Sequence, residues 1–243
     1  MSTSGAATLP TMSVLVIQHQ ATCPPARLGQ WLREEGVDLD VRRPWEGDAL
    51  PGDLADHAGL VVLGGQMGCR EDRVAPWLPA TRELIRVAAK GATPTVGVCL
   101  GHQLAAVALG GDVGRNPAGR TLGIFTTRGG DELVGDPVLR AAQDAPIPQW
   151  NDDIVTRLPS DATPLATNER GDLLLARLAP TVWGVQGHPE ADRRIVARWA
   201  ETDAGTTELD GVDVPATLAS IEASEAAIEE AWRPVAAAFA GRL

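Results

Sequence analysis

The hydrophobic positions of this 243-residue chain follow two alternating patterns: short apolar runs, and segments with the period of an amphipathic helix. The short runs predict strands, and they lie at residues 13–18, 38–42, 59–63 and 94–98. Helical periods fill the intervals, at residues 26–35, 77–90 and 100–109. Strands that alternate with helices predict an α/β fold with a doubly wound, mostly parallel sheet flanked by helices. Ligands of such sheets gather at the carboxyl ends of the strands.

The second half of the chain has a different pattern. Shorter strand-like pieces between Asp112 and Gln186 predict a small antiparallel extension, at residues 123–127, 147–150, 165–168 and 173–177. A strand at 182–186 and a helix at 191–200 follow, then a loop at 202–214 and a helix from Pro215. Pro234 is expected to bend or divide that last helix. We expect three regions: a disordered tail at 1–12, one domain at 13–200, and a helical extension at 201–243 packed on the same domain.

Cys99 stands between Gly97 and Gly101, where an apolar strand gives way to a helical pattern. A side chain on such a turn projects outward, and small residues two positions away on either side prevent collisions with the neighbouring backbone. The new helix directs its unpaired N–H groups toward the sulfur, which favours the thiolate. This arrangement is typical of a nucleophile, although a lone cysteine in an apolar segment is otherwise often a core residue.

A second segment, His188-Pro189-Glu190, also follows a predicted strand. Pro189 keeps His188 out of a helix, so His188 and Glu190 fall on an extended loop where they can point the same way. A cysteine nucleophile needs a base, and the base needs an acceptor that fixes its tautomer. Alone the segment is compatible with a capped turn. Together with Cys99 it predicts a Cys-His-Glu catalytic triad.

The segment 97–103, Gly-Val-Cys-Leu-Gly-His-Gln, and the His-Pro-Glu segment at 188–190 resemble the motifs of class I (triad-type) glutamine amidotransferases. The chain resembles the related glutaminase domain of GMP synthetase, and we expect it to stand alone. An apolar run that leads into the pair Gly64-Gly65, and a later Pro-Trp-Leu at 76–78, match the family as well. The resemblance covers about residues 14–190 and implies a flavodoxin-like arrangement of the sheet.

The resemblance also implies roles for the matching residues. Cys99 would attack the side-chain carboxamide of glutamine, His188 would protonate the departing ammonia, and Glu190 would hold His188. Water would then hydrolyse the γ-glutamyl thioester. An oxyanion hole and a substrate contact are implied by the glycine pair Gly64 and Gly65, the backbone of Leu100 and the side chain of Gln103.

Four positions depart from the family pattern or vary within it. Gln66 follows the glycine pair where many relatives have proline. Gly187 precedes His188 where an aromatic residue is usual, so we expect a looser wall behind the base. Asn151 stands where many relatives have histidine, on a loop expected near the entrance of the active site. His102 is the variable position of the elbow and is expected to face outward.

Composition and charge narrow the class of protein. The formal net charge is −11, from 21 Lys and Arg against 32 Asp and Glu, which argues against nucleic acid as a partner. No apolar stretch approaches the roughly 18 residues that cross a bilayer, so we expect no membrane contact and a cytoplasmic protein. Neither the three cysteines nor the four histidines have the spacing of metal ligands, so we expect no metal and no cofactor.

Three hypotheses about function follow. The first is a glutamine-hydrolysing subunit that supplies ammonia to a separate synthetase or amidoligase, because no second catalytic domain or phosphate-binding P-loop appears in this chain. The second is a stand-alone hydrolase of γ-glutamyl peptides or conjugates that uses the same thioester chemistry. The third is a non-catalytic regulatory relative that retains the elbow as scaffold, although such a protein would not need His188 and Glu190.

Overall fold

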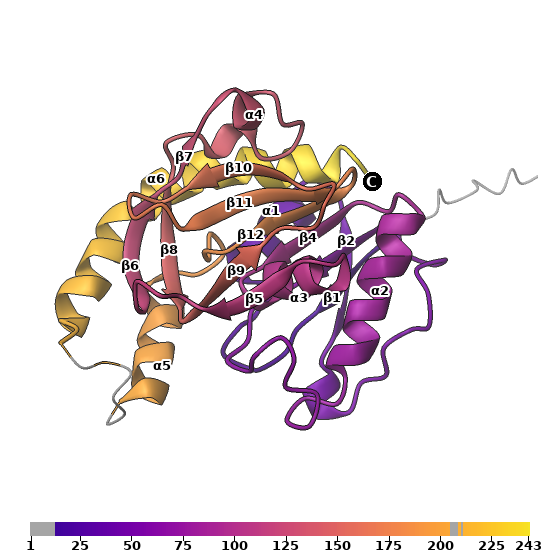
Figure 1. Ribbon diagram of the computed structural model, residues 1–243, viewed down its shortest axis with the longest axis horizontal. Coiled ribbons are helices and arrows are strands. Elements are labelled where there is room, and N and C mark those ends of the chain that lie inside the picture. The colour runs from indigo at the N-terminus through magenta and orange to yellow at the C-terminus, as the bar shows by residue number, and fades with distance from the viewer. Residues whose placement is uncertain (1–12, 205–208, 210) are drawn as a thin grey trace, which may run out of the picture.

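A computed structural model describes residues 13–204, 209 and 211–243 of the chain. The tail expected at 1–12 and part of the loop expected at 202–214 lie outside the described residues. The fold is built on an eight-stranded sheet in the order β2-β1-β3-β4-β12-β11-β10-β7 (Figure 1). The first five strands of this order are parallel: β2 (Asp38–Arg42), β1 (Ser13–Ile17), β3 (Gly59–Val62), β4 (Thr95–Val98) and β12 (Val182–Val185).

Helices cover both faces of this sheet. Alternate residues of β1 belong to different cores, because successive side chains of a strand point to opposite faces. Val14 and Val16 pack in the cluster that contains α1 (Ala26–Glu34) and α6 (Val214–Ala240). Leu15 and Ile17 pack in the cluster with α2 (Leu78–Lys90) and α3 (Leu100–Ala108). The doubly wound, mostly parallel α/β fold predicted from the sequence is therefore confirmed.

The antiparallel part is larger than the sequence pattern indicates. β11 (Leu173–Ala179), β10 (Thr163–Thr167) and β7 (Arg128–Gly129) continue the main sheet in antiparallel orientation. Two separate two-stranded sheets pair β5 (Asp112–Arg115) with β9 (Asp153–Arg157) and β6 (Thr121–Thr126) with β8 (Pro146–Asn151). One short helix, α4 (Asp131–Val134), follows β7.

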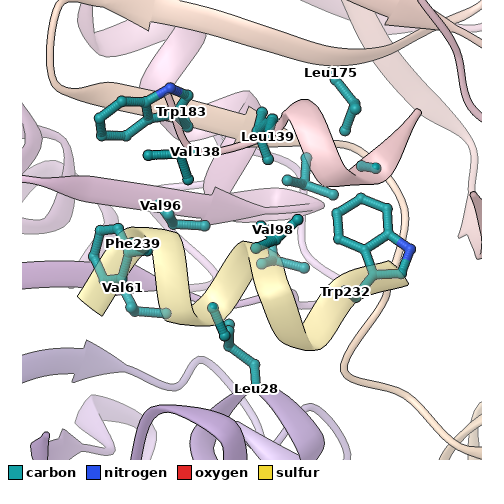
Figure 2. Packing of buried hydrophobic residues seen from close by; sticks show 14 of the residues in the cluster. Leu28, Val61, Val96, Val98, Val138, Leu139, Leu175, Trp183, Trp232 and Phe239 are labelled. Atoms are coloured by element: carbon teal, nitrogen blue, oxygen red, sulfur yellow. The ribbon is translucent and has the colours of Figure 1, made fainter. Parts of the chain in front are cut away.

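The last two helices are α5 (Arg193–Asp203) and α6. Trp232 and Phe239 of α6 point toward Val96 and Val98 of the central strand β4 (Figure 2), and both aromatic side chains are almost fully buried. Of the two expectations for Pro234, division of the helix is wrong, since α6 runs unbroken through it, and bending remains a prediction. Buried anchors on both sides of the proline hold the helix against the sheet and offset the missing backbone hydrogen bond.

No helix among residues 13–204 and 211–243 combines the length and the apolar character that crossing a membrane requires.

Candidate active site

Cys99 occupies a sharp turn between the end of β4 and the start of α3. Its backbone has φ 50° and ψ −106°, a conformation that non-glycine residues rarely adopt and that is often found at functional sites. The two flanking glycines make this turn sterically feasible. A Cβ at Gly97 would lie 2.5 Å from the Gly101 carbonyl carbon, and a Cβ at Gly101 would collide with the Val62 carbonyl oxygen.

The segment that carries His188 and Glu190 lies beside this turn. Its strand β12 is parallel to β4, with Val185 opposite Val98, and the Cys99 N–H donates to the Val185 carbonyl at 2.7 Å. His188 Nδ1 lies 2.8 Å from Glu190 Oε1, and the two side chains are 3% and 2% exposed. Because a carboxylate accepts, Nδ1 carries the proton in this pair and Nε2 is left for the substrate side.

The electrostatics of His188 depend on its two neighbours. Burial alone would lower the pKa of His188, but charge interactions and hydrogen bonds with Cys99 and Glu190 raise it from 6.5 to about 10. The imidazole therefore holds its second proton at neutral pH, which is the state that a general acid needs.

The glycine pair predicted for the oxyanion hole lies against the same group. Gly64 faces both His188 and Cys99, since a Cβ on it would lie 2.9 Å from His188 Cε1 and 3.7 Å from Cys99 Cβ. Gly65 lies against Leu100, whose Cδ2 would be 2.9 Å from a Cβ at position 65. The structure thus brings together the loop after β3 and the first residue of α3, as the arrangement predicted from the sequence requires.

Gln103 is close to the cavity, but its amide group already has partners. Its Nε2 donates to the Asp153 carbonyl at 2.9 Å and lies 3.4 Å from Gln186 Oε1. Gln186 in turn directs its Nε2 toward Cys99 Sγ at 3.7 Å. A chain of side-chain amides therefore links the β9 backbone to the sulfur. The substrate contact expected of Gln103 remains a prediction.

The wall behind His188 is closed, so the expectation of a loose wall at Gly187 is wrong. The ring of Trp199, from α5, lies 4.5 Å from the His188 ring between centroids. A side chain at position 187 would have no room, because a Cβ there would lie 2.6 Å from two atoms of Ile147. The ring that supports the base comes from a helix downstream of the motif.

His102 does not face outward, which corrects a second expectation. Its side chain is fully buried between α3 and β12, in the space left by the missing side chain of Gly184. Among the described residues neither ring nitrogen has a hydrogen-bond partner, and burial lowers the pKa of His102 from 6.5 to about 4. Its place at the variable position of the elbow was misleading because α3 is buried on nearly every side, from Leu100 through Ala106.

A cavity of about 630 Å³ opens onto Cys99 and His188. Asn151 lies in its wall, at the end of β8 and not on a loop, with its Nδ2 donating to the Asp153 carbonyl at 3.2 Å. The wall also includes Arg120, Asp152 and Asp203, and Arg120 is paired with both carboxylates. Within the described ranges, no three or more His, Cys, Asp or Glu side chains are grouped to hold a metal ion.

The sequence interpretation missed Gln20, Gln186 and Trp199. Gln186 had a usable signal, because parallel pairing of β4 with β12 places the residue after Val185 next to Cys99. Trp199 and Gln20 had none, since each reaches the site through a tertiary contact that no local pattern reveals.

The fold and the motifs agree with comparisons to known proteins. The family described as Glutamine amidotransferase class-I matches residues 27–195, more than half of the chain. Anthranilate synthase component 2 of Azospirillum brasilense is 34% identical over 68% of this chain and 81% of its own length. Gamma-glutamyl peptidase 3 of Arabidopsis thaliana is 28% identical over 67% of each chain.

Similarity in structure extends further along the chain. A glutamine amidotransferase from Thermotoga maritima superposes with a TM-score of 0.83 at 25% identity, over 94% of this chain and 98% of that one. This protein is therefore a member of the class I glutamine amidotransferase family.

Proposed function

We propose that this protein hydrolyses the side-chain amide of glutamine through a thioester on Cys99 and releases glutamate and ammonia. The observation that carries the proposal is the meeting of three groups, two of which, Cys99 and His188, line one cavity. These are a cysteine on a strained strand-to-helix turn, the buried His188 that interacts with it, and Glu190 at 2.8 Å from the histidine.

The chemistry follows from the positions of these groups. Cys99 Sγ attacks the γ-carboxamide carbon, while its proton resides on His188. Negative charge develops on the carboxamide oxygen, where the backbone N–H groups of Gly65 and Leu100 can stabilise it. When the intermediate collapses, the C–N bond breaks and His188 gives its proton to the departing nitrogen. Water, deprotonated by His188, then attacks the thioester and frees both glutamate and the thiol.

The ammonia would be used by a separate synthetase or amidoligase. Support comes from a relative named as component 2 of anthranilate synthase, which aligns over most of its length with this chain. Ammonia released into water at neutral pH is mostly protonated and no longer nucleophilic, so a docked acceptor would preserve its reactivity.

The shape of the cavity favours a second candidate, a hydrolase of γ-glutamyl peptides or conjugates. A volume of about 630 Å³ lies in the range of roughly 300–1,000 Å³ that holds drug-sized ligands, which are larger than glutamine. Two tryptophans line the cavity beside the base. The ring centroids of Trp199 and Trp150 are 6.5 Å apart, and Arg120 Cζ lies 5.9 Å from the centroid of the Trp150 ring. Such a wall suits a leaving group larger than ammonia.

Steady-state assays of the pure chain separate the two candidates. Glutamine and a γ-glutamyl dipeptide are compared as substrates, with and without proteins that copurify with the chain. Glutamine turnover that rises with a copurified protein supports the amidotransferase. Fast dipeptide hydrolysis by the chain alone supports the second candidate.

A matched pair of variants tests the nucleophile in either case. Cys99→Ala should abolish turnover, whereas Cys69→Ala, at a buried cysteine outside the cavity wall, should retain it. Absence of turnover of both substrates, with no labelling of Cys99 by a glutamine-like electrophile, would instead indicate a non-catalytic regulatory protein.

A further inference from the structure

The side chain of Gln20 links the glycine loop after β3 to the turn after β1. Its Oε1 accepts a hydrogen bond from the Gln66 backbone N–H at 2.9 Å. Its Nε2 donates to Thr22 Oγ1 at 2.6 Å and lies 3.3 Å from Cys23 Sγ. A backbone N–H can only donate, so this network fixes which end of the Gln20 amide faces position 66. All four residues line the cavity that contains Cys99.

The bonded N–H belongs to the peptide that joins Gly65 to Gln66, and the orientation of that peptide sets ψ of Gly65. Glycine has more backbone freedom than any other residue and loses the most on being fixed. Glycine at position 65 also avoids crowding, because a Cβ there would lie 2.7 Å from Met67 Sδ and 2.9 Å from Leu100 Cδ2 and would require these side chains to move. The loop therefore needs a constraint from outside its own backbone.

We infer that Gln20 is a positioning residue that fixes the peptide after Gly65 and so holds the glycine loop in place, including the preceding peptide, whose Gly65 N–H faces the substrate oxygen. The inference rests on the proposed function, because it assigns Gln20 to the oxyanion hole of that reaction. Gln20 makes no bond to the reacting atoms in this role. It acts through the loop, and its own anchor is the Thr22–Cys23 turn. Burial raises the pKa of Cys23, so this anchor stays a neutral thiol.

Proline at position 66 would supply the same constraint by a different physical route. It has no N–H and so needs no acceptor. Its ring also restricts the backbone of the preceding residue to the extended region, which here is Gly65. The effect of removing the Gln20 acceptor should therefore depend on which residue occupies position 66.

A double-mutant cycle with Gln20→Leu and Gln66→Pro tests this dependence. In the natural background, Gln20→Leu should lower kcat for glutamine by roughly three- to tenfold, the effect of one lost hydrogen bond, with little change in KM. In the Gln66→Pro background the same substitution should lower kcat less than twofold. An equal loss in both backgrounds, or no loss in either, would overturn the inference.

A labelling ratio provides a readout that does not depend on the folding of the Gln66→Pro variant. A chloromethyl ketone derived from glutamine forms an oxyanion when Cys99 adds to its carbonyl, whereas iodoacetamide alkylates the sulfur without one. Gln20→Leu should slow ketone labelling by a similar factor and leave iodoacetamide labelling unchanged. Equal slowing of both reagents would assign Gln20 a general structural role and overturn the inference. A natural enzyme that neither hydrolyses glutamine nor reacts with the ketone would instead refute the proposed function itself.

Discussion

His188 Nδ1 and Glu190 Oε1 lie 2.8 Å apart in a site from which solvent is almost excluded, and this pair governs the protonation of the base. The charges of Cys99 and Glu190 raise the pKa of His188 to about 10 against the effect of burial. A group with a raised pKa is protonated below that value, so His188 remains an acid across the neutral range and loses its proton only near pH 10.

Glu190→Gln should lower kcat by about a hundredfold or more, because the neutral amide neither stabilises the imidazolium nor reliably selects the tautomer. Removing the negative charge also lowers the pKa of His188, so the alkaline limb of the kcat profile should move to lower pH. The matched control is Asp192→Asn, which neutralises a nearby carboxylate that caps α5. It should leave both the helix cap and the limb in place, because asparagine caps a helix about as well as aspartate. An unmoved limb in Glu190→Gln would contradict this assignment.

Gly101→Ala should destabilise the protein, because the added Cβ would collide with the Val62 carbonyl oxygen at the crossing of α3 and β3. Overpacking of this kind costs about 1–3 kcal/mol or more where the obstacle is backbone. Gly114→Ala is the control, since a Cβ there would meet only Thr156 Cγ2 at an ordinary 3.6 Å. Urea unfolding measures both variants, and equal stability of the two would show that the close approach at Gly101 is not required.

His102 should make the fold sensitive to mild acid. Its pKa is about 4 in the folded state and 6.5 when exposed, so between these values the unfolded chain binds a proton that the folded chain does not. Stability then falls as pH decreases, by about 1.4 kcal/mol per pH unit from this group. His19, whose pKa burial also lowers to about 4, adds a similar slope. Urea titrations between pH 6.5 and 4.5 measure how the free energy of unfolding changes with pH. His102→Met should reduce that slope by the contribution of one histidine, and an unchanged slope would exclude His102 as a source.

Gln186→Glu should slow the reaction of Cys99 with iodoacetamide, because it replaces the amide donor 3.7 Å from Sγ with a carboxylate that repels the thiolate. We expect a decrease of about tenfold at pH 7. Gln30→Glu, on the exposed face of α1, is the charge-matched control and should react normally. Equal alkylation rates for the two variants would show that the Gln186 amide does not act on the sulfur.

The sequence was sufficient to predict the elements that carry the site, for reasons that particular residues illustrate. The spacing of Gly97, Cys99 and Gly101 indicates that the backbone is crowded on both sides of the cysteine, and the structure has close backbone contacts at both glycines. The residues around Pro189 lie on a loop, as the proline predicts. Both signals are local, so a single sequence contains them.

What the sequence could not reveal depends on contacts between distant segments. The burial of His102 depends on Gly184, which lies 82 positions downstream, and the wall behind His188 is a tryptophan from α5. The Gln20–Gln66 hydrogen bond joins two loops that meet only because β1 and β3 are neighbours in the sheet. Such contacts follow from strand order, which periodicity alone does not determine.

The most direct test of the central claim is mass spectrometry of the protein mixed with glutamine and quenched in acid within the first turnover. We predict that the peptide containing Cys99 gains the mass of one γ-glutamyl group, that hydroxylamine removes this group, and that Cys99→Ala does not gain it. Glutamine turnover without any such adduct on Cys99, or with an adduct on Cys23 instead, would contradict the proposed mechanism.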